Sequence, residues 1–208
     1  MLAPYPAAGS HLQQGRQAWS TLDSGGECRS TGLPVMPLYL EDVDINPELE
    51  GAESVLIVPC RMCPATSLSL RKNMPFFEFF KSLFRSPALD KYIENLKSGL
   101  KGRGINTGVY FSRQFLACAW TSRERNRLLK QATPYDTVIV LGCNSATESV
   151  RDALVSTGAK VIQGMQVSGI VNVKVKFNFP GTLSLEDHKI ISVSHNKKQE
   201  NMSGKVER

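Results

Sequence analysis

The sequence contains little histidine and no long apolar run. Its three histidines, His11, His188 and His195, fall in expected tails or in an expected C-terminal hairpin, so no Ser-His-Asp triad can be assembled from them. No apolar run approaches the roughly 20 residues that a membrane-spanning helix requires. The N-terminus lacks the basic stretch and apolar stretch of a secretory signal. These absences argue against a histidine-based hydrolase and a membrane-spanning helix, and they predict a cytoplasmic location.

A complete glycine-rich dinucleotide-binding loop is also missing. Residues 101–108, Lys-Gly-Arg-Gly-Ile-Asn-Thr-Gly, come near one, but Thr107 occupies the position of the third glycine. The segment also precedes an expected strand, whereas the nucleotide fingerprint follows one. We interpret it as a turn between a helix and a strand.

What the sequence does contain is an alternation of apolar and amphipathic segments. Short apolar runs typical of buried strands occupy residues 54–58, 106–111, 136–141 and 160–163. Helical spacing of apolar residues marks residues 76–100, with a break at Ser86-Pro87. Residues 122–131 are interpreted as a basic helix, and a capping box at Ser145 opens a further helix. This order predicts an α/β fold with three layers and a mostly parallel sheet.

The two ends of the chain depart from this alternation. From Ile170 to Phe179 apolar and polar residues alternate strictly, which predicts an antiparallel hairpin, starting at about residue 166 and appended to the sheet. Residues 36–50 indicate a short lead-in helix that starts at Asn46-Pro47. Residues 1–35 and 195–208 are polar without a sustained period, so we expect disordered tails on either side of one domain over residues 36–194.

The net charge of +6 is unevenly distributed. Between Cys60 and Lys130 there are fourteen lysine and arginine residues and four acids, which leaves +10 on this segment. A basic face attracts an anionic cofactor, an acidic partner protein or nucleic acid, although a solvated helix surface has the same composition. Among the partners, we favour a larger redox or methyl-transfer enzyme over nucleic acid.

Four of the five cysteines lie at or after predicted strands. Cys60 and Cys63 form a C-x-x-C pair after the strand 54–58, Cys143 ends the run 137–143 that contains the strand 136–141, and Cys118 follows the strand 106–111 by seven residues. Because the carboxyl ends of parallel strands share one edge of a sheet, these thiols can meet there. Four thiolates suit zinc or a [4Fe-4S] cluster. Cys28, in a Gly/Ser-rich stretch, is interpreted as incidental.

Two other readings of the cysteines stay open at this stage. A C-x-x-C pair can exchange disulfides, with Cys60 as nucleophile and Cys63 as resolving thiol. Cys118 and Cys143 can instead be buried core residues, as free cysteines often are. A third hypothesis combines a structural zinc with nucleic-acid binding by the basic stretch.

A second, weaker site is predicted at the start of the helix that follows Cys143. Gly142, Asn144 and Ser145 lie between the strand 136–141 and this helix. Backbone N–H groups at a helix start bind anions, so these three residues are candidates for contacting a bound cofactor.

The cysteine motifs resemble a known family. Val-Leu-Ile-Val-Pro-Cys-Arg-Met-Cys at 55–63, the later Cys118 and Ile-Val-Leu-Gly-Cys at 139–143 are similar to the cysteine-rich C-terminal domain of methylenetetrahydrofolate reductase, over roughly residues 40–165. The resemblance implies a metal or iron–sulfur centre on the four cysteines. It also implies a small subunit with a role in one-carbon metabolism or in feeding electrons to a flavoprotein partner, which would bind any flavin.

Overall fold

The computed structural model describes residues 33–78 and 85–192. Its helices are α1 (Cys63–Lys72), α3 (Pro87–Gly102), α4 (Ser122–Ala132) and α5 (Asn144–Leu154), with short 3₁₀ turns η2 (Pro47–Leu49) and η3 (Ala117–Ala119). Its strands are β1 (Leu33–Val35), β2 (Leu38–Asp42), β3 (Ser54–Pro59), β4 (Phe77–Glu78), β5 (Asn106–Val109), β6 (Thr137–Leu141), β7 (Lys160–Gln163), β8 (Met165–Asn178) and β9 (Thr182–Ser192). In these ranges no helix is long and apolar enough to cross a bilayer.

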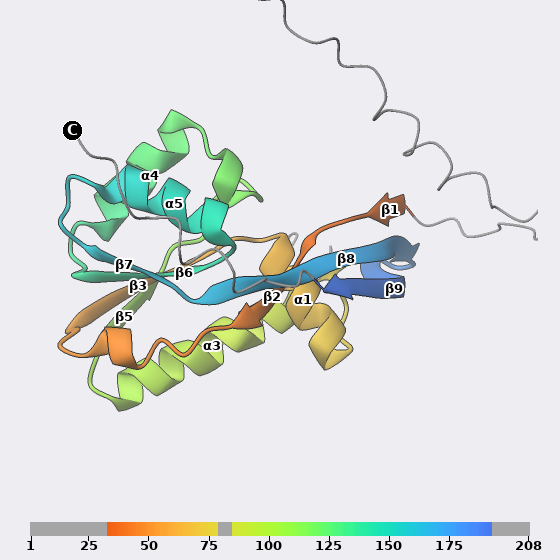
Figure 1. Cartoon of the computed structure of the whole chain (residues 1–208), viewed down its shortest axis with the longest axis horizontal. Helices are drawn as coiled ribbons and strands as arrows, with labels where there is room; N and C mark the ends of the chain where they lie inside the picture. Colours follow the sequence, from red (N-terminus) through yellow and green to blue (C-terminus); the bar gives the residue numbers. More distant parts are fainter. Residues whose placement is uncertain (1–32, 79–84, 193–208) are drawn as a thin grey trace, which may run out of the picture. The chain divides into compact units, whose positions relative to one another are not determined.

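The predicted α/β fold with a parallel sheet is confirmed. Strands β5, β3, β6 and β7 form this sheet in that order, and all three pairings are parallel. Helix α3 lies on one face, and α4 and α5 lie on the other (Figure 1). Strands β3 and β6 are central and almost completely buried, which explains why both read as continuous apolar runs.

The strand order reverses between β3 and β6. After β3 the chain crosses to β5 on one side, and after β6 it crosses to β7 on the other side. The two crossovers therefore place their helices on opposite faces of the sheet. Between the carboxyl ends of β3 and β6 this leaves the crevice where open α/β sheets bind ligands.

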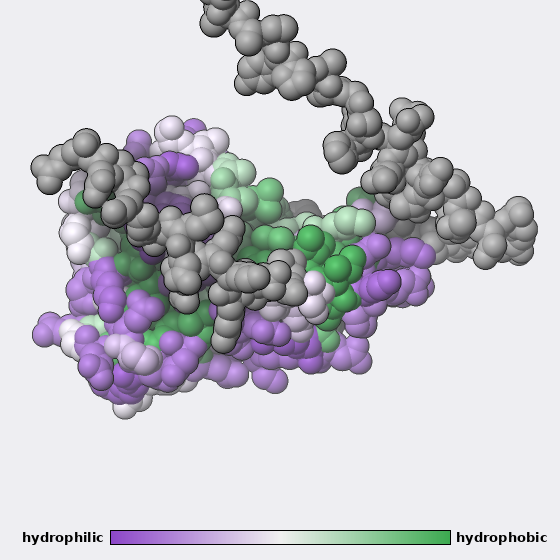
Figure 2. All heavy atoms as spheres, in the orientation of Figure 1, coloured by the Kyte–Doolittle hydropathy of each residue, from purple (hydrophilic) through white to green (hydrophobic). Residues whose placement is uncertain are grey.

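The C-terminal hairpin belongs to a second sheet. The predicted antiparallel hairpin is confirmed as β8 and β9, but it pairs with β1, β2 and β4 instead of extending the parallel sheet. Gly164 joins the two sheets, because its N–H donates to the Val140 carbonyl at 2.9 Å and its carbonyl accepts the Val43 N–H at 3.2 Å. Figure 2 shows hydrophobic residues around the middle of β8 and hydrophilic ones over α3.

Several local predictions are wrong. The lead-in helix expected from Asn46-Pro47 is only the short 3₁₀ turn η2, and residues 38–42 before it, where no strand was predicted, form β2. The helix expected from residue 76 is strand β4 at Phe77–Glu78, and residues 79–84 lie outside the described ranges. Residues 33–35, assigned to the tail, form β1. In each case pairing with β8 or β9 outweighs the local helical or irregular preference.

The capping box predicted at Ser145 is also wrong. Helix α5 begins at Asn144, two residues before the start that an N-cap at Ser145 would give; its N-cap residue is Cys143, and no side chain caps it. The Thr147 hydroxyl donates to the Cys143 carbonyl instead, at 3.2 Å. Cys143 therefore sits at the junction of strand and helix.

A polar staple holds β3 and β6 together at the opposite edge of the sheet. The Asp136 carboxylate accepts the backbone N–H and the hydroxyl of Ser54, both at 2.7 Å, and the Glu53 N–H at 3.1 Å. Burial raises the pKa of Asp136, but the hydrogen bonds from Thr137, Ser54 and Glu53 outweigh it and leave this pKa below its usual value. The staple sets the relative position of the two strands that end beside Cys60 and Cys143.

We expect Asp136→Ala to lower the free energy of unfolding by about 1–2 kcal/mol, because it leaves three donors without their acceptor. Asp152→Ala is the matched control, since Asp152 makes an exposed ion pair with Arg125 and should cost less than about 0.5 kcal/mol. Urea unfolding of both variants measures the difference. Equal stabilities would show that the staple contributes nothing.

Candidate thiol site

The carboxyl ends of β3 and β6 bring Cys60 next to the residues around Cys143. The Cys60 N–H donates to the Leu141 carbonyl at 2.8 Å, one step beyond the ladder that ends with the Pro59–Leu141 pair. Both cysteines are buried, with 4% of Cys60 and 7% of Cys143 exposed. The predicted convergence of two distant strand ends is thus present in the backbone.

Gly142 is the residue that permits this close approach. A Cβ atom at this position would lie 2.8 Å from the Cβ of Ala146 and 3.3 Å from the Cβ of Cys60. The first distance is shorter than side chains tolerate, so only glycine lets the start of α5 pack against the end of β3. Gly142 therefore acts through packing, which differs from its predicted role in contacting a cofactor.

Cys63 is the first residue of α1. Its side chain is half-buried, and its carbonyl accepts the Ser67 hydroxyl at 2.9 Å. The same Ser67 oxygen accepts the Leu40 N–H at 2.8 Å, so α1 and β2 are held together at this point. Sequence reasoning missed Ser67, because nothing in a Ser-Leu-Ser-Leu run distinguishes one serine from the next.

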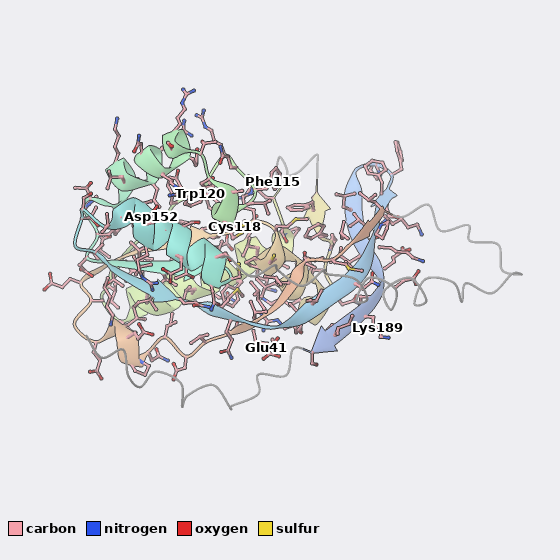
Figure 3. All side chains as sticks on the ribbon, turned by 45° about the horizontal axis from the view of Figure 1, so that its top comes forward. Glu41, Phe115, Cys118, Trp120, Asp152 and Lys189 are labelled. Carbon is pink, nitrogen blue, oxygen red and sulfur yellow. The ribbon has the colours of Figure 1, made fainter. Side chains whose placement is uncertain are left out.

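Cys118 lies on η3, in the loop between β5 and α4, and its side chain is exposed. This turn packs against α5 (Figure 3). The same loop contacts the C-x-x-C segment, because the Phe115 carbonyl accepts the Arg61 N–H at 3.0 Å. The Cys60 Sγ atom also approaches that carbonyl, at 3.8 Å. The loop thus brings the third cysteine-bearing segment to the first.

A buried carboxylate holds this loop in place. Glu124, 4% exposed, accepts the Tyr110 hydroxyl at 2.7 Å and the Arg113 N–H at 3.1 Å, and it pairs with Arg127 at 2.9 Å. Burial raises the pKa of Glu124, but the bonds from Tyr110, Arg113 and Ser112 and the charge of Arg127 outweigh it, so the pKa is lowered. Nothing in the basic run 122–131 indicates that its one acid is structural.

The thiols influence one another electrostatically. Burial is the largest cause that raises the pKa of Cys60, and the charges of Cys118 and Cys143 add to it. Burial likewise raises the pKa of Cys63 to about 11, and the charges of Cys60, Cys143 and Cys118 contribute. Backbone hydrogen bonds from Ala117 and Met62 to Cys60, and from Leu38 to Cys63, act in the opposite direction. The four thiols therefore share one electrostatic environment.

Shared electrostatics does not amount to coordination geometry. Within residues 33–78 and 85–192, no three side chains of His, Cys, Asp or Glu are placed so that they could hold a metal ion. A thiol can influence the pKa of another thiol without lying close enough to share a metal ion with it, because charges act over several ångströms whereas a zinc–sulfur bond is only about 2.3 Å long. The donor chemistry fits a soft metal, but the sulfur positions do not yet form a site.

The second predicted site borders a pocket whose described side chains are mostly neutral. Asn144 lines an open pocket of about 430 Å³, and its Oδ1 atom accepts the Gln163 side-chain N–H at 2.8 Å. The described lining residues are Val43, Glu48, Asn144, Gln163, Gln166 and Val167, with one carboxylate and no cation among them. Ser145 is exposed and Gly142 is packed against Cys60. The binding of a cofactor by these three residues stays a prediction.

Comparison with known proteins adds no identity: no family model, no curated protein and no solved structure matches this chain.

We expect Gly142→Ala to destabilise the protein by about 1–3 kcal/mol, because the new methyl group overlaps Ala146 and displaces Cys60. Gly99→Ala is the control: Gly99 lies inside α3, and nothing lies within 4 Å of an added Cβ. That variant should gain about 0.5–1 kcal/mol. Thermal or urea unfolding compares the two. A Gly142→Ala protein of unchanged stability would contradict the packing argument.

We expect Glu124→Gln to lower the free energy of unfolding at pH 7 by about 1–3 kcal/mol, because charge-assisted bonds are lost. The pKa of Glu124 is lowered from its usual 4.5, so its stabilising effect is complete above that value and is lost as the pH falls through the folded-state pKa. The difference between the wild type and the variant should therefore shrink below about pH 5.

Unfolding curves between pH 7 and pH 3 measure this difference. The control is Glu148→Gln, since Glu148 is an exposed residue that pairs with Arg151. A gap between wild type and Glu124→Gln that does not change with pH would show that the charge of Glu124 is not what holds the loop.

Proposed function

We propose that the chain is a small metalloprotein in which the thiolates of Cys60, Cys63, Cys118 and Cys143 bind one zinc ion or one [4Fe-4S] cluster. The observation that carries the proposal is that, after burial, the charges of Cys60, Cys143 and Cys118 all add to the raised pKa of Cys63, although these cysteines come from segments up to 83 residues apart in the sequence. A bound cation removes this repulsion, because it replaces the protons and stabilises the thiolates.

The position in the fold supports the same proposal. Cys60 and Cys63 follow β3, and Cys143 follows β6, so they flank the crevice at which the strand order reverses. Both Cys63 and Cys143 lie at the start of a helix, where the positive end of the helix dipole favours a thiolate. Cys118 lies on an exposed turn. It is the ligand that would have to move toward Cys60, Cys63 and Cys143 when the metal binds.

Thiol–disulfide exchange fits the site less well. A reactive C-x-x-C pair needs an accessible first thiol with a lowered pKa. Here Cys60 is buried, and burial raises its pKa. Among the described residues no lysine or arginine contributes to the pKa shift of either thiol of the pair. The pair therefore lacks the usual source of activation.

Nucleic-acid binding is also less favoured. Several cations of the basic stretch are committed to acids within the chain: Arg71 to Asp42, Arg85 to Asp90, Arg125 to Asp152 and Arg127 to Glu124. A phosphate backbone would have to compete with these pairs. The surface therefore offers fewer phosphate contacts than its composition suggests.

We infer a supporting role in the chemistry of a larger redox or methyl-transfer enzyme, as the resemblance to the methylenetetrahydrofolate reductase domain implies. A cluster would supply one-electron transfer and a zinc ion would supply Lewis acidity. The chain's own part is to hold the ligands, through the β3–β6 pairing, the Ser67 link and the Glu124-anchored loop. Any flavin would belong to the partner.

The test is metal analysis of protein purified without oxygen, followed by single Cys→Ser variants. We expect about one zinc or four iron atoms per chain, and a loss of at least tenfold in metal affinity for each of the four variants. Cys28→Ser is the matched control and should bind like the wild type. A metal-free protein with a reversible Cys60–Cys63 disulfide would contradict the proposal and support exchange.

A further inference from the structure

Three apolar side chains beside Cys118 remain partly open to solvent. Phe111 is 40% exposed, Phe115 39% and Leu116 41%. All three belong to the loop between β5 and α4 that carries Cys118. Most large apolar side chains of this domain are buried, so an exposed group on one loop is a candidate for an interaction surface.

Two guanidinium groups lie over these rings. The Arg61 guanidinium is 4.4 Å from the centre of the Phe115 ring, and that of Arg85 is 4.5 Å from the centre of the Phe111 ring. Burial lowers the pKa of Arg61, and the charge of Arg85 lowers it further, so the two arginines are neighbours. These contacts join Phe111, Phe115, Leu116, Arg61 and Arg85 into what we name the aromatic–arginine surface.

The aromatic–arginine surface is held in shape by the fold. The Phe115 ring meets the ring of buried Phe77 edge-on, with centroids 5.9 Å apart. The loop is tied at one end to Arg61 through the Phe115 carbonyl and at the other to Glu124. A preorganised surface loses little entropy on binding, and arginine and aromatic residues are the types that dominate protein interfaces.

The charge of this region selects the partner. From Tyr110 to Lys130 the chain has five arginine or lysine residues and one acid, the buried Glu124. Arg127 pairs with Glu124 and Arg125 with Asp152, so the excess positive charge rests on Arg113, Arg123 and Lys130. Asp90 pairs with Arg85 and offsets part of the charge, but the region as a whole stays positive. An acidic surface complements it, whereas a second copy of the chain would present the same positive face in a symmetric dimer.

We propose that the aromatic–arginine surface binds an acidic protein surface, in contact with the loop that carries Cys118. This goes beyond the metal centre proposed above, and it holds whether or not the thiols bind a metal. Single-stranded nucleic acid is the less suitable occupant, because base stacking needs open ring faces. Here arginine covers one face of each ring, and Phe77 contacts Phe115.

The experiment is photo-crosslinking in the cells that make the protein, with benzoylphenylalanine in place of Leu116 and, in a second variant, of Phe111. The control position is Val155, which is 83% exposed at the end of α5. Mass spectrometry identifies the crosslinked peptide. We expect both loop positions to crosslink to an acidic segment of one other protein, and position 155 to give no such product.

A second set of variants tests whether the positive charge of the loop contributes to binding. Arg113→Glu, on the loop, should reduce the crosslinking yield at least fivefold, whereas Lys189→Glu, an equal charge change on exposed β9, should leave it unchanged. Circular dichroism checks that both variants fold. The proposal is overturned by crosslinks to nucleic acid or to a second copy, by equal yields at position 155, by insensitivity to Arg113→Glu, or by no crosslink at all.

Metal content measured in the same samples separates the two proposals. Crosslinking that persists in a Cys118→Ser variant without metal would leave the binding surface supported and count only against the metal centre. Stoichiometric metal with no crosslink would support the metal centre and overturn the proposed binding surface.

Discussion

The parallel pairing of β3 with β6 is the constraint on which the candidate site depends. The ladder runs from Val55–Thr137 to Pro59–Leu141 and is extended by the bond from Cys60 to Leu141. Because successive side chains of a strand point to opposite faces, a slip of one residue would reverse every buried side chain. Close packing on each face and the bonds from Ser54 to Asp136 therefore hold the register, and the register places the residues that follow each strand.

Burial and charge act against each other at this site. Water is excluded from Cys60 and Cys143, so either thiolate costs free energy unless a cation or hydrogen-bond donors compensate it. Backbone donors at Ala117, Met62 and Leu38 compensate only in part, since the pKa of Cys60 and that of Cys63 remain raised. When these thiols lose their protons, the protein compensates the negative charge only in part. A bound cation would compensate the rest, and this is the physical basis of the proposed metal centre.

The sequence predicted an element correctly where the element's burial alone produced its pattern of apolar residues. The buried runs of β3 and β6, the basic amphipathic α4 and the alternating β8 each followed from hydrophobic periodicity. The prediction failed where distant strands competed with a local preference. The aromatic run at Phe76 has helical spacing, yet Phe77 pairs with Leu183, more than a hundred residues away. The start of α5 was misplaced by two residues because Cys143, which has no side-chain cap, takes the N-cap position two residues after β6 ends.

The sequence by itself determined the α/β class and the assignment of Cys60, Cys63 and Cys143 to strand ends, because burial patterns and turn residues act over a few neighbouring positions. The tertiary structure alone decided that Cys118 lies against α5, that Glu124 is buried under its loop and that Gly142 is needed for packing. It also decided that Phe115 is covered by Arg61. These are contacts between segments far apart in the chain, and their energies depend on the final packing, which no local pattern encodes.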